Sequence, residues 1–378
     1  MNVTIETPNL IGIFITSYLV STLAGIAGIG GGAMLISLYS LIGNISIKYS
    51  IILSVITITG NSFIRTIYYS FKKNEKTKNR YLPNYEIVRL IVPFDGNLSY
   101  IGYILNKILP NFVIFILIII LMLILCYKTI IKTIQFVRKK STKDDIFIIF
   151  DNIETKLSDN ITINYNRKGQ TKKDIIDNYI YIILSFSLII IFTIARNLIK
   201  PYWLVYIIQF FIIILFGYFT IKHIQLQYKW RKKILFNFIE GDIEWNNYIN
   251  FIKYCTTASF VGLISTMVGI GGGMIMNPLL INYGILPDIV IATSSITTFF
   301  SSIASALQFI IEDNIFEWYF IALFGIGGFS SITGIIILKF LKKKIKIIIT
   351  IILAITLVLS LILLIIFNVL TFINDGIN

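Results

Sequence analysis

Gly28-Ile29-Gly30-Gly31-Gly32 and Gly269-Ile270-Gly271-Gly272-Gly273 are two copies of one motif, and each copy interrupts a long apolar stretch. The copies stand 241 residues apart (269 − 28). The same offset pairs Gly43 with Gly284, Ser54 with Ser295, and Thr57 with Thr298. A self-match at a fixed offset indicates an internal repeat. The sequence therefore predicts two related halves, each starting with a glycine-broken helix.

The composition places these halves in a lipid bilayer. Of the 378 residues, 56% are hydrophobic and 14% are charged, whereas soluble domains carry about 25% charged residues. A helix needs about 20 apolar residues to cross a bilayer, and the chain supplies many such runs. Phe112–Cys126, for example, is almost entirely apolar. We therefore predict an all-α fold, a polytopic transmembrane helical bundle, and an integral multi-pass membrane protein.

The formal charge of +14 does not indicate a nucleic-acid partner. Most Lys and Arg residues lie in loops between apolar runs, as the positive-inside rule expects. No zinc-finger, homeodomain or RRM signature accompanies them. Cys126, Cys255 and His223 are widely separated, so the sequence predicts neither a metal site nor a disulfide framework. We predict no cofactor.

The chain divides into four parts. Transmembrane repeat 1 comprises residues 9–136, and a polar cytosolic loop follows at residues 137–178. Residues 179–250 hold two linker helices and a basic connector, and residues 251–374 form transmembrane repeat 2.

Loop charges predict that the two repeats are inverted. The loop after the second helix of repeat 1 is basic, from Lys72 to Arg80, and is therefore assigned to the cytosol. Its equivalent in repeat 2 holds Glu312, Asp313 and Glu317 without Lys or Arg. Counting every apolar run as one span makes the repeats parallel instead. The conflict disappears if each glycine-broken run is a re-entrant pair of half-helices that returns to its own side.

The glycines are candidate substrate contacts. Unwound backbone at membrane depth is tolerated only where protein or a water-filled cavity surrounds it. Its N–H groups and the positive end of the following half-helix favour an anion. The alternative is close helix packing of the GxxxG type. A phosphate-binding P-loop is excluded because the required Lys and Ser/Thr are missing. The candidates are Gly28, Gly30, Gly31, Gly32, Gly269, Gly271, Gly272 and Gly273, with Pro278 as a helix-kinking residue.

A polar stripe follows each motif. Its members recur at three- to four-residue spacing, so they share one helix face. The stripes are Ser54, Thr57, Asn61 and Arg65 in repeat 1, and Ser295, Thr298 and Ser302 in repeat 2, where Ala306 replaces the arginine. They bind substrate or form interhelical hydrogen bonds. Arg65 is an intramembrane cation and a candidate anion ligand, unless its side chain snorkels to the nearby basic loop. Arg196, near a helix end, is expected at the interface.

These motifs resemble the sulfite exporter TauE/SafE family, which includes 4-toluene sulfonate uptake permease-type membrane proteins. The residues that carry the resemblance are Gly269–Pro278, Gly284–Pro287 and Ala292–Ser295. The first copy, Gly28–Gly32, matches more loosely and lacks the proline. The section with Pro93, Gly102, Asn106 and Pro110 is similar to the eukaryotic branch. The resemblance implies export or uptake of small sulfur-containing anions, such as sulfite or organosulfonates.

The functional prediction is a secondary transporter of small anions that alternates access at a repeat-interface site. An enzyme is not expected, because no catalytic cluster of His, Asp or Cys is evident. A non-transporting receptor or scaffold and an anion channel are the alternatives. The expected partners are a small anion, the lipid bilayer and a coupling ion, H⁺ or Na⁺. The sequence leaves open the substrate, the transport direction, the membrane and the oligomeric state.

Overall fold

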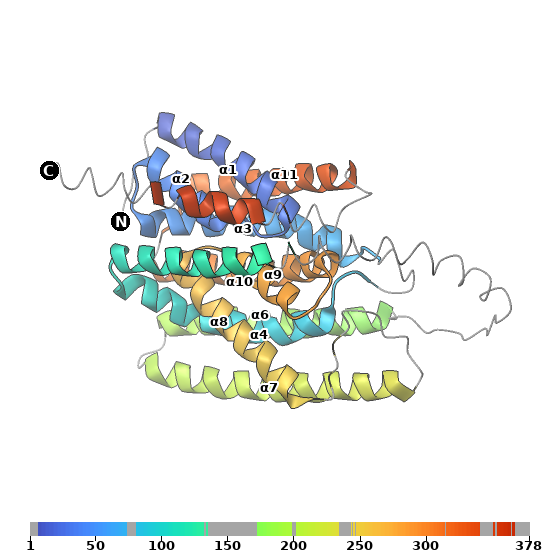
Figure 1. Cartoon of the computed structure of the whole chain (residues 1–378). Helices are drawn as coiled ribbons and strands as arrows, with labels where there is room; N and C mark the ends of the chain where they lie inside the picture. The colour runs from blue at the N-terminus through green and yellow to red at the C-terminus, as the bar shows by residue number, and fades with distance from the viewer. Residues whose placement is uncertain are drawn as a thin grey trace, which may run out of the picture.

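The computed structural model is helical throughout most of the part of the chain that it describes (Figure 1). This part comprises residues 7–73, 81–131, 172–198, 202–233, 247–313, 315–340 and 354–363, with positions 134, 243, 245, 351, 365 and 366. The labelled helices are α1 (Thr7–Ala27), α2 (Gly32–Gly43), α3 (Ile47–Ser70), α4 (Tyr85–Ile108), α6 (Lys172–Leu198), α7 (Tyr202–Lys233), α8 (Tyr248–Val268), α9 (Gly272–Asn282), α10 (Pro287–Asp313) and α11 (Trp318–Phe340). A further helix spans Asn111–Ile131. Within the described residues, eight helices are long and apolar enough to cross a membrane, which confirms the predicted all-α polytopic bundle.

Polar residues at the helix starts help to define where the apolar helices begin. The Ser46 hydroxyl accepts a hydrogen bond from the Tyr49 N–H at the start of α3. Asn84 Oδ1 accepts hydrogen bonds from the first turn of α4. Such N-cap residues satisfy N–H groups that have no partner within the helix. Pro287 begins α10, at a position where its missing N–H breaks no helical hydrogen bond.

Glycines break both apolar runs that carry the repeated motif. α1 ends at Ala27 before α2 begins at Gly32, and α8 ends at Val268 before α9 begins at Gly272. Positive φ angles occur in both loops, a conformation that a Cβ disfavours. The loop residues that adopt it are Gly28, Gly30, Gly31, Gly269 and Gly271. The predicted glycine breaks are therefore confirmed.

The two arms of each broken run differ in length. α1 and α8 have 21 residues each, or about 31 Å at the helical rise, enough to cross the hydrocarbon core. α2 has 12 residues and α9 has 11, or about 17 Å. The prediction of two half-helices per run is wrong for the first arm, because the glycines come only after a full span of apolar residues.

Each short arm folds back along the long arm that precedes it. A Cβ on Gly12, near the start of α1, would lie 2.6 Å from Ile42 Cγ2 near the end of α2. In the second run, the ring centroids of Tyr254 and Tyr283 lie 5.4 Å apart. Each run therefore starts and ends toward the same end of the bundle.

The long helices run in two opposite directions (Figure 1). Between two parallel helices, the residue numbers of successive contact pairs rise on both helices. Between two antiparallel helices, the numbers rise on one helix and fall on the other. The pairs are Phe14–Trp318 and Thr22–Thr333 (α1 with α11), Tyr49–Tyr319 and Asn61–Ser330 (α3 with α11), Glu86–Trp245 and Asn106–Met267 (α4 and its N-terminal end with α8 and the residues before it), Asn84–Thr293 and Ser99–Gln308 (α4 with α10), and Ser62–Ser302 and Thr66–Ser295 (α3 with α10). Thus α1, α3 and α11 are parallel to one another and antiparallel to α4, α8 and α10.

The third long helix of each predicted half packs with the other half. α4 follows α3 in the chain but packs most extensively against α8, whereas α11 follows α10 but packs against α3 and α1. Glycines allow the backbones to approach closely at these contacts. Gly102 and Gly262 lie between α4 and α8, and Gly60 and Gly327 lie between α3 and α11. The bundle therefore consists of two interleaved groups, α1–α3 with α11 and α8–α10 with α4.

Charged residues distinguish the two ends of the bundle. Lys339 Nζ, near the end of α11, lies 5.3 Å from the ring centroid of Tyr68 near the end of α3, and Lys72 follows on the same end. At the other end, Lys107 pairs with Asp313 at 3.0 Å. The cytosolic position of the α3–α4 loop, which rests on the positive-inside rule, stays a prediction. Most of the predicted polar loop and the lysines at positions 342–346 lie outside the described residues.

Arg196, near the end of α6, is buried. Its side chain is 2% exposed, and its Cζ lies 3.5 Å from the ring centroid of Tyr100. Its Nη1 donates to Gln209 Oε1 at 2.9 Å, and its Nε lies 3.7 Å from Glu312 Oε1. Residues of α4, α7 and α10 therefore enclose this end of α6, and the predicted interfacial depth of Arg196 stays a prediction.

Candidate functional site

The two glycine loops cross inside the bundle. A Cβ on Gly32 would lie 2.6 Å from Ile270 Cα, and a Cβ on Gly273 would lie 3.1 Å from the Gly28 carbonyl oxygen. Gly32 and Gly273 are equivalent under the 241-residue offset, so each faces the loop of the other half. Asn277 Nδ2 on α9 also donates to the Gly28 carbonyl at 3.0 Å. The two copies of the motif therefore form one continuous site.

This crossing is enclosed by protein. The Ile29 and Ile270 side chains, at the centre of the two loops, have no exposed area. α2 and α9 both begin here. The first N–H groups of a helix have no intrahelical partners, and the helix dipole is positive at that end. The crossing thus brings together two helix ends that favour negative charge.

Ile58 on α3 lies against both loops. A Cβ on Gly30 or on Gly271 would lie 2.9 Å from its side chain. Gly31 also has a positive φ, and Pro278 is buried within α9. These predicted residues shape the backbone around the crossing and contribute no polar side chain to it.

The first two members of the α3 stripe form interhelical hydrogen bonds. Ser54 Oγ donates to the Gly269 carbonyl at 2.9 Å and thereby ties α3 to the second glycine loop. Thr57 Oγ1 lies 2.9 Å from Tyr39 Oη on α2. Both hydroxyls also bond to carbonyls of α3 itself. In this arrangement the two hydroxyls hold the loops in place. This is the interhelical hydrogen bonding that the sequence offered as the alternative to substrate binding.

Arg65 is fully buried without a hydrogen-bond partner. Its side chain has no exposed area, and its Nε, Nη1 and Nη2 atoms bond to no other group within the described residues. A snorkelling side chain keeps its charged head in water, and the guanidinium of Arg65 does not reach water. The structure thus places the stripe's cation inside the bundle.

Asn61, one turn before Arg65, belongs to a polar cluster that the sequence only partly indicated. Its Nδ2 donates to the Ser21 carbonyl on α1 at 2.9 Å. A Cβ on Gly25 would lie 3.4 Å from Asn61 Nδ2 and 3.9 Å from the backbone of Ser331 on α11. The hydroxyls of Ser21 and Ser331 and the Asn61 Oδ1 atom lack partners among the described residues. Sequence pattern missed both serines, because single serines in apolar helices are common.

The α10 stripe is less uniform than its counterpart. Ser295 and Ser302 donate to backbone carbonyls of α10 itself, at 2.6 and 3.2 Å. Thr298 Oγ1 is buried and has no hydrogen-bond partner among the described residues. It lies 2.5 Å from the position of a Cβ on Gly273, and so faces the glycine crossing. Of the three residues, Thr298 is therefore the one placed to contact a ligand there.

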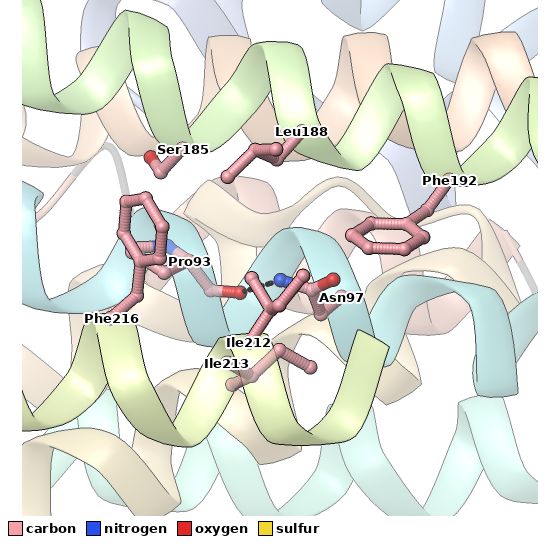
Figure 2. Close-up of a pocket in the computed structure, with 8 residues that line it drawn as sticks. All are labelled: Pro93, Asn97, Ser185, Leu188, Phe192, Ile212, Ile213 and Phe216. Carbon is pink, nitrogen blue, oxygen red and sulfur yellow. Dashed lines mark hydrogen bonds between the residues drawn. The ribbon is translucent and has the colours of Figure 1, made fainter. Parts of the chain in front are cut away.

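A pocket between α4, α6 and α7 lies away from these residues (Figure 2). It is lined by Pro93, Asn97, Ser185, Leu188, Phe192, Ile212, Ile213 and Phe216. Its polar groups already bond locally, since Asn97 Nδ2 donates to the Pro93 carbonyl and Gln209 Nε2 donates to Asn97 Oδ1, both at 2.6 Å. An apolar lining without a cation gives this pocket no affinity for anions.

Comparison with known proteins finds similar proteins in one family. A family model described as Sulfite exporter TauE/SafE matches residues 254–371, a region that includes the second glycine loop. Sulfite exporter TauE/SafE family protein 1 of Arabidopsis thaliana is 24% identical over 79% of this chain and 69% of its own length. Family protein 3 of the same plant is 23% identical over 82% of this chain and 67% of its own length. The chain is thus similar to TauE/SafE family proteins. No solved structure matches this chain.

These matches confirm the resemblance based on the glycine motif and its flanking residues. The eight apolar helices within the described residues make the protein an integral, multi-pass membrane protein, and the family that it resembles is described as a sulfite exporter family. The curated TauE/SafE matches extend over 317 and 332 residues, so they reach well beyond the region of the family model into the first half.

Proposed function

We propose that this protein is a secondary transporter of small anions, with sulfite or an organosulfonate as substrate. The observation that carries the proposal is Arg65, a fully buried guanidinium with no hydrogen-bond partner among the described residues. A buried cation without a counter-charge is costly. Arg65 lies about two helical turns after Ile58, which touches both glycine loops, and a bound anion that completes the site best explains a buried guanidinium there.

The chemistry of the site suits an oxyanion. A guanidinium can donate two parallel hydrogen bonds to a pair of oxygens, and a sulfonate or sulfite group presents such pairs. Thr298 adds a buried hydroxyl without a hydrogen-bond partner, and the helix starts at Gly32 and Gly272 add N–H groups. Names of the curated relatives, which describe sulfite exporter family proteins, support the same substrate class.

The arrangement of the helices supports an alternating-access mechanism. We propose that the halves are inverted repeats, because α1, α3 and α4 each run opposite to their equivalents α8, α10 and α11. Transporters of this kind bind substrate at the repeat interface and rock one repeat against the other. Toward the basic end, the apolar residues Tyr69, Leu82 and Leu338 pack together and cover Arg65's end of α3. Separation of this layer would open the site to the cytosol.

The test combines anion binding and flux for an Arg65→Gln variant. Hydrogen bonds to charged groups contribute about 1.5–3 kcal/mol, so we expect sulfite affinity to fall roughly 10- to 100-fold. Removal of an unpaired buried charge should meanwhile raise the thermal stability of the anion-free protein. Purified protein is titrated with sulfite, sulfate, a sulfonate and a carboxylate by thermal shift. Sulfite counterflow is then measured in proteoliposomes.

Lys48→Gln is the matched control, because Lys48 is a cation on the same helix and lies at its opposite end. It should leave both binding and flux unchanged. An Arg65→Gln protein that binds and carries sulfite like the unmodified chain would refute the assignment of Arg65. Sulfite counterflow that is absent from the unmodified protein would refute the transport proposal itself.

A further inference from the structure

Asp95 is a buried acid in the middle of α4. Its side chain is 1% exposed, and its Oδ1 has no hydrogen-bond partner among the described residues. α4 touches α8 here, since a Cβ on Gly262 would lie 2.7 Å from Asp95 Cα. A carboxyl group enclosed in this way demands a physical explanation.

No cation within the described residues pairs with this carboxyl. The nearest arginine on α4, Arg89, donates to Asn178 at 3.3 Å and stacks on Tyr181. Arg196 of α6 contacts Tyr100, Gln209 and Glu312, as described above. Other titratable groups on the helices around Asp95 lie nearer the helix ends. They are Tyr85, Glu86, Tyr100, Tyr103 and Lys107 on α4, Tyr248, Lys253, Tyr254 and Cys255 on α8, Asp288, Glu312 and Asp313 on α10, Asp177, Tyr179 and Tyr181 on α6, and Tyr218, Lys222, His223, Tyr228, Lys229 and Lys232 on α7.

A serine connects Asp95 to the second glycine loop. The Ser301 hydroxyl of α10 interacts with the Asp95 carboxyl and lies 3.4 Å from Ser265 Oγ on α8. A Cβ on Gly272 would lie 3.1 Å from Ser301 Oγ. One serine thus separates the acid from the first residue of α9. A change in the charge of Asp95 would change the electrostatic potential at the start of α9, the helix end that favours an anion.

We propose that Asp95 carries the proton that is cotransported with the anion. A charged Asp95 carboxylate repels an anion at the adjacent crossing, whereas the protonated carboxyl does not. Binding of the anion therefore favours uptake of one proton by the carboxyl, and the reverse holds by thermodynamic linkage. A monovalent anion and a proton together carry no net charge through the enclosed site. This inference rests on the proposed anion transport, because the bound anion is what links the protonation of Asp95 to transport.

Infrared spectroscopy of the Asp95→Asn variant tests the site without any transport. The unmodified protein at neutral pH should show the carbonyl stretch of a protonated carboxyl, and Asp95→Asn should lack it. Asparagine preserves the shape of the side chain and can still bond to Ser301. Asp313→Asn on α10 is the control, because this acid pairs with Lys107 near an exposed end, and it should retain the band. If the band is absent from the unmodified protein, or persists in Asp95→Asn, the proposal is overturned.

Proteoliposomes test the coupling with methanesulfonate, whose charge does not change between neutral and mildly acidic pH. An imposed proton gradient should accelerate uptake by the unmodified protein at least about tenfold. In Asp95→Asn we expect less than a twofold response, with methanesulfonate counterflow retained, because exchange requires no loss of the proton. Retained counterflow also shows that the variant is folded. An Asp95→Asn protein that still responds to the proton gradient, or an unmodified protein driven by Na⁺ and not by protons, overturns the inference.

Absence of counterflow from the unmodified protein instead refutes the proposed function. The infrared result then still decides whether Asp95 is protonated.

Discussion

Replacement of Gly32 by alanine tests whether the two glycine loops must touch. Gly32 is not among the glycines with positive φ, and it begins α2. Alanine is therefore compatible with its backbone and favours the helix by up to about 1 kcal/mol. The opposing effect is steric. The new Cβ would lie 2.6 Å from Ile270 Cα, whereas carbon atoms normally approach to about 3.5 Å.

The loops would thus have to separate by roughly 0.9 Å to accept the methyl group. Overpacking of a close-packed interior typically costs about 1–3 kcal/mol. Because backbone and not a flexible side chain opposes the methyl group, we expect the upper part of this range before the gain in helix propensity. A net loss of about 1–2 kcal/mol lowers the ratio of folded to unfolded protein roughly 5- to 30-fold. The thermal midpoint in detergent should decrease, and sulfite counterflow should fall because the loops that form the proposed site are displaced.

Two other glycine-to-alanine variants calibrate this measurement. Gly325→Ala in α11 meets no atom within 4 Å, so it should leave both readouts unchanged or slightly raise stability. Gly273→Ala approaches Thr298 Oγ1, a side-chain atom that can rotate away, and should be intermediate. The reasoning is refuted if Gly32→Ala behaves like Gly325→Ala, because the two glycine loops would then not be in contact in the folded protein.

Three further substitutions test individual contacts around the site and at the N-terminal end of α4. Ser54→Ala removes the 2.9 Å hydrogen bond to the Gly269 carbonyl and should lower stability by about 1–3 kcal/mol; a thermal midpoint equal to that of the unmodified protein would contradict this role. Trp245→Phe removes the 2.6 Å hydrogen bond that Trp245 Nε1 donates to Glu86 Oε2. It should destabilise the protein by about 1.5–3 kcal/mol, measured as a lower denaturation midpoint. When Glu86 is already replaced by Gln, the same Trp245→Phe substitution should have little further effect. Gly271→Ala places a Cβ on backbone at φ 79° and ψ 132°, at a cost of about 1–3 kcal/mol; unchanged stability and sulfite flux would show that the loop adopts another conformation.

The sequence located the glycine loops but not their mutual contact. A cluster of glycines within an apolar run predicts a break, because glycine alone tolerates positive φ at little cost. Nothing in the local pattern tells that Gly32 faces Ile270, since that contact joins segments far apart in the chain. The same limit applies to the stripe. Spacing placed Ser54 and Arg65 on one face, but only packing shows that Ser54 bonds to a carbonyl while Arg65 has no hydrogen-bond partner among the described residues.

Asp95 shows where pattern reading fails. It lies within α4, and the periodicity of an apolar segment does not reveal whether an acid faces lipid, water or protein. The burial of Arg196 was missed for the same reason, since proximity to a helix end does not determine what covers that end. Burial depends on neighbouring helices, and here α8, α10 and α7 come from distant parts of the chain.

By itself the sequence determined the membrane location, the glycine breaks and the resemblance to TauE/SafE family proteins, because hydrophobicity, backbone freedom and short motifs are properties of contiguous residues. The tertiary structure decided that α4 and α11 pack with the opposite halves, that the glycine loops cross, and that Arg65 and Asp95 are enclosed. These features arise from contacts between residues far apart in the chain, and such contacts leave no local signature in composition or spacing.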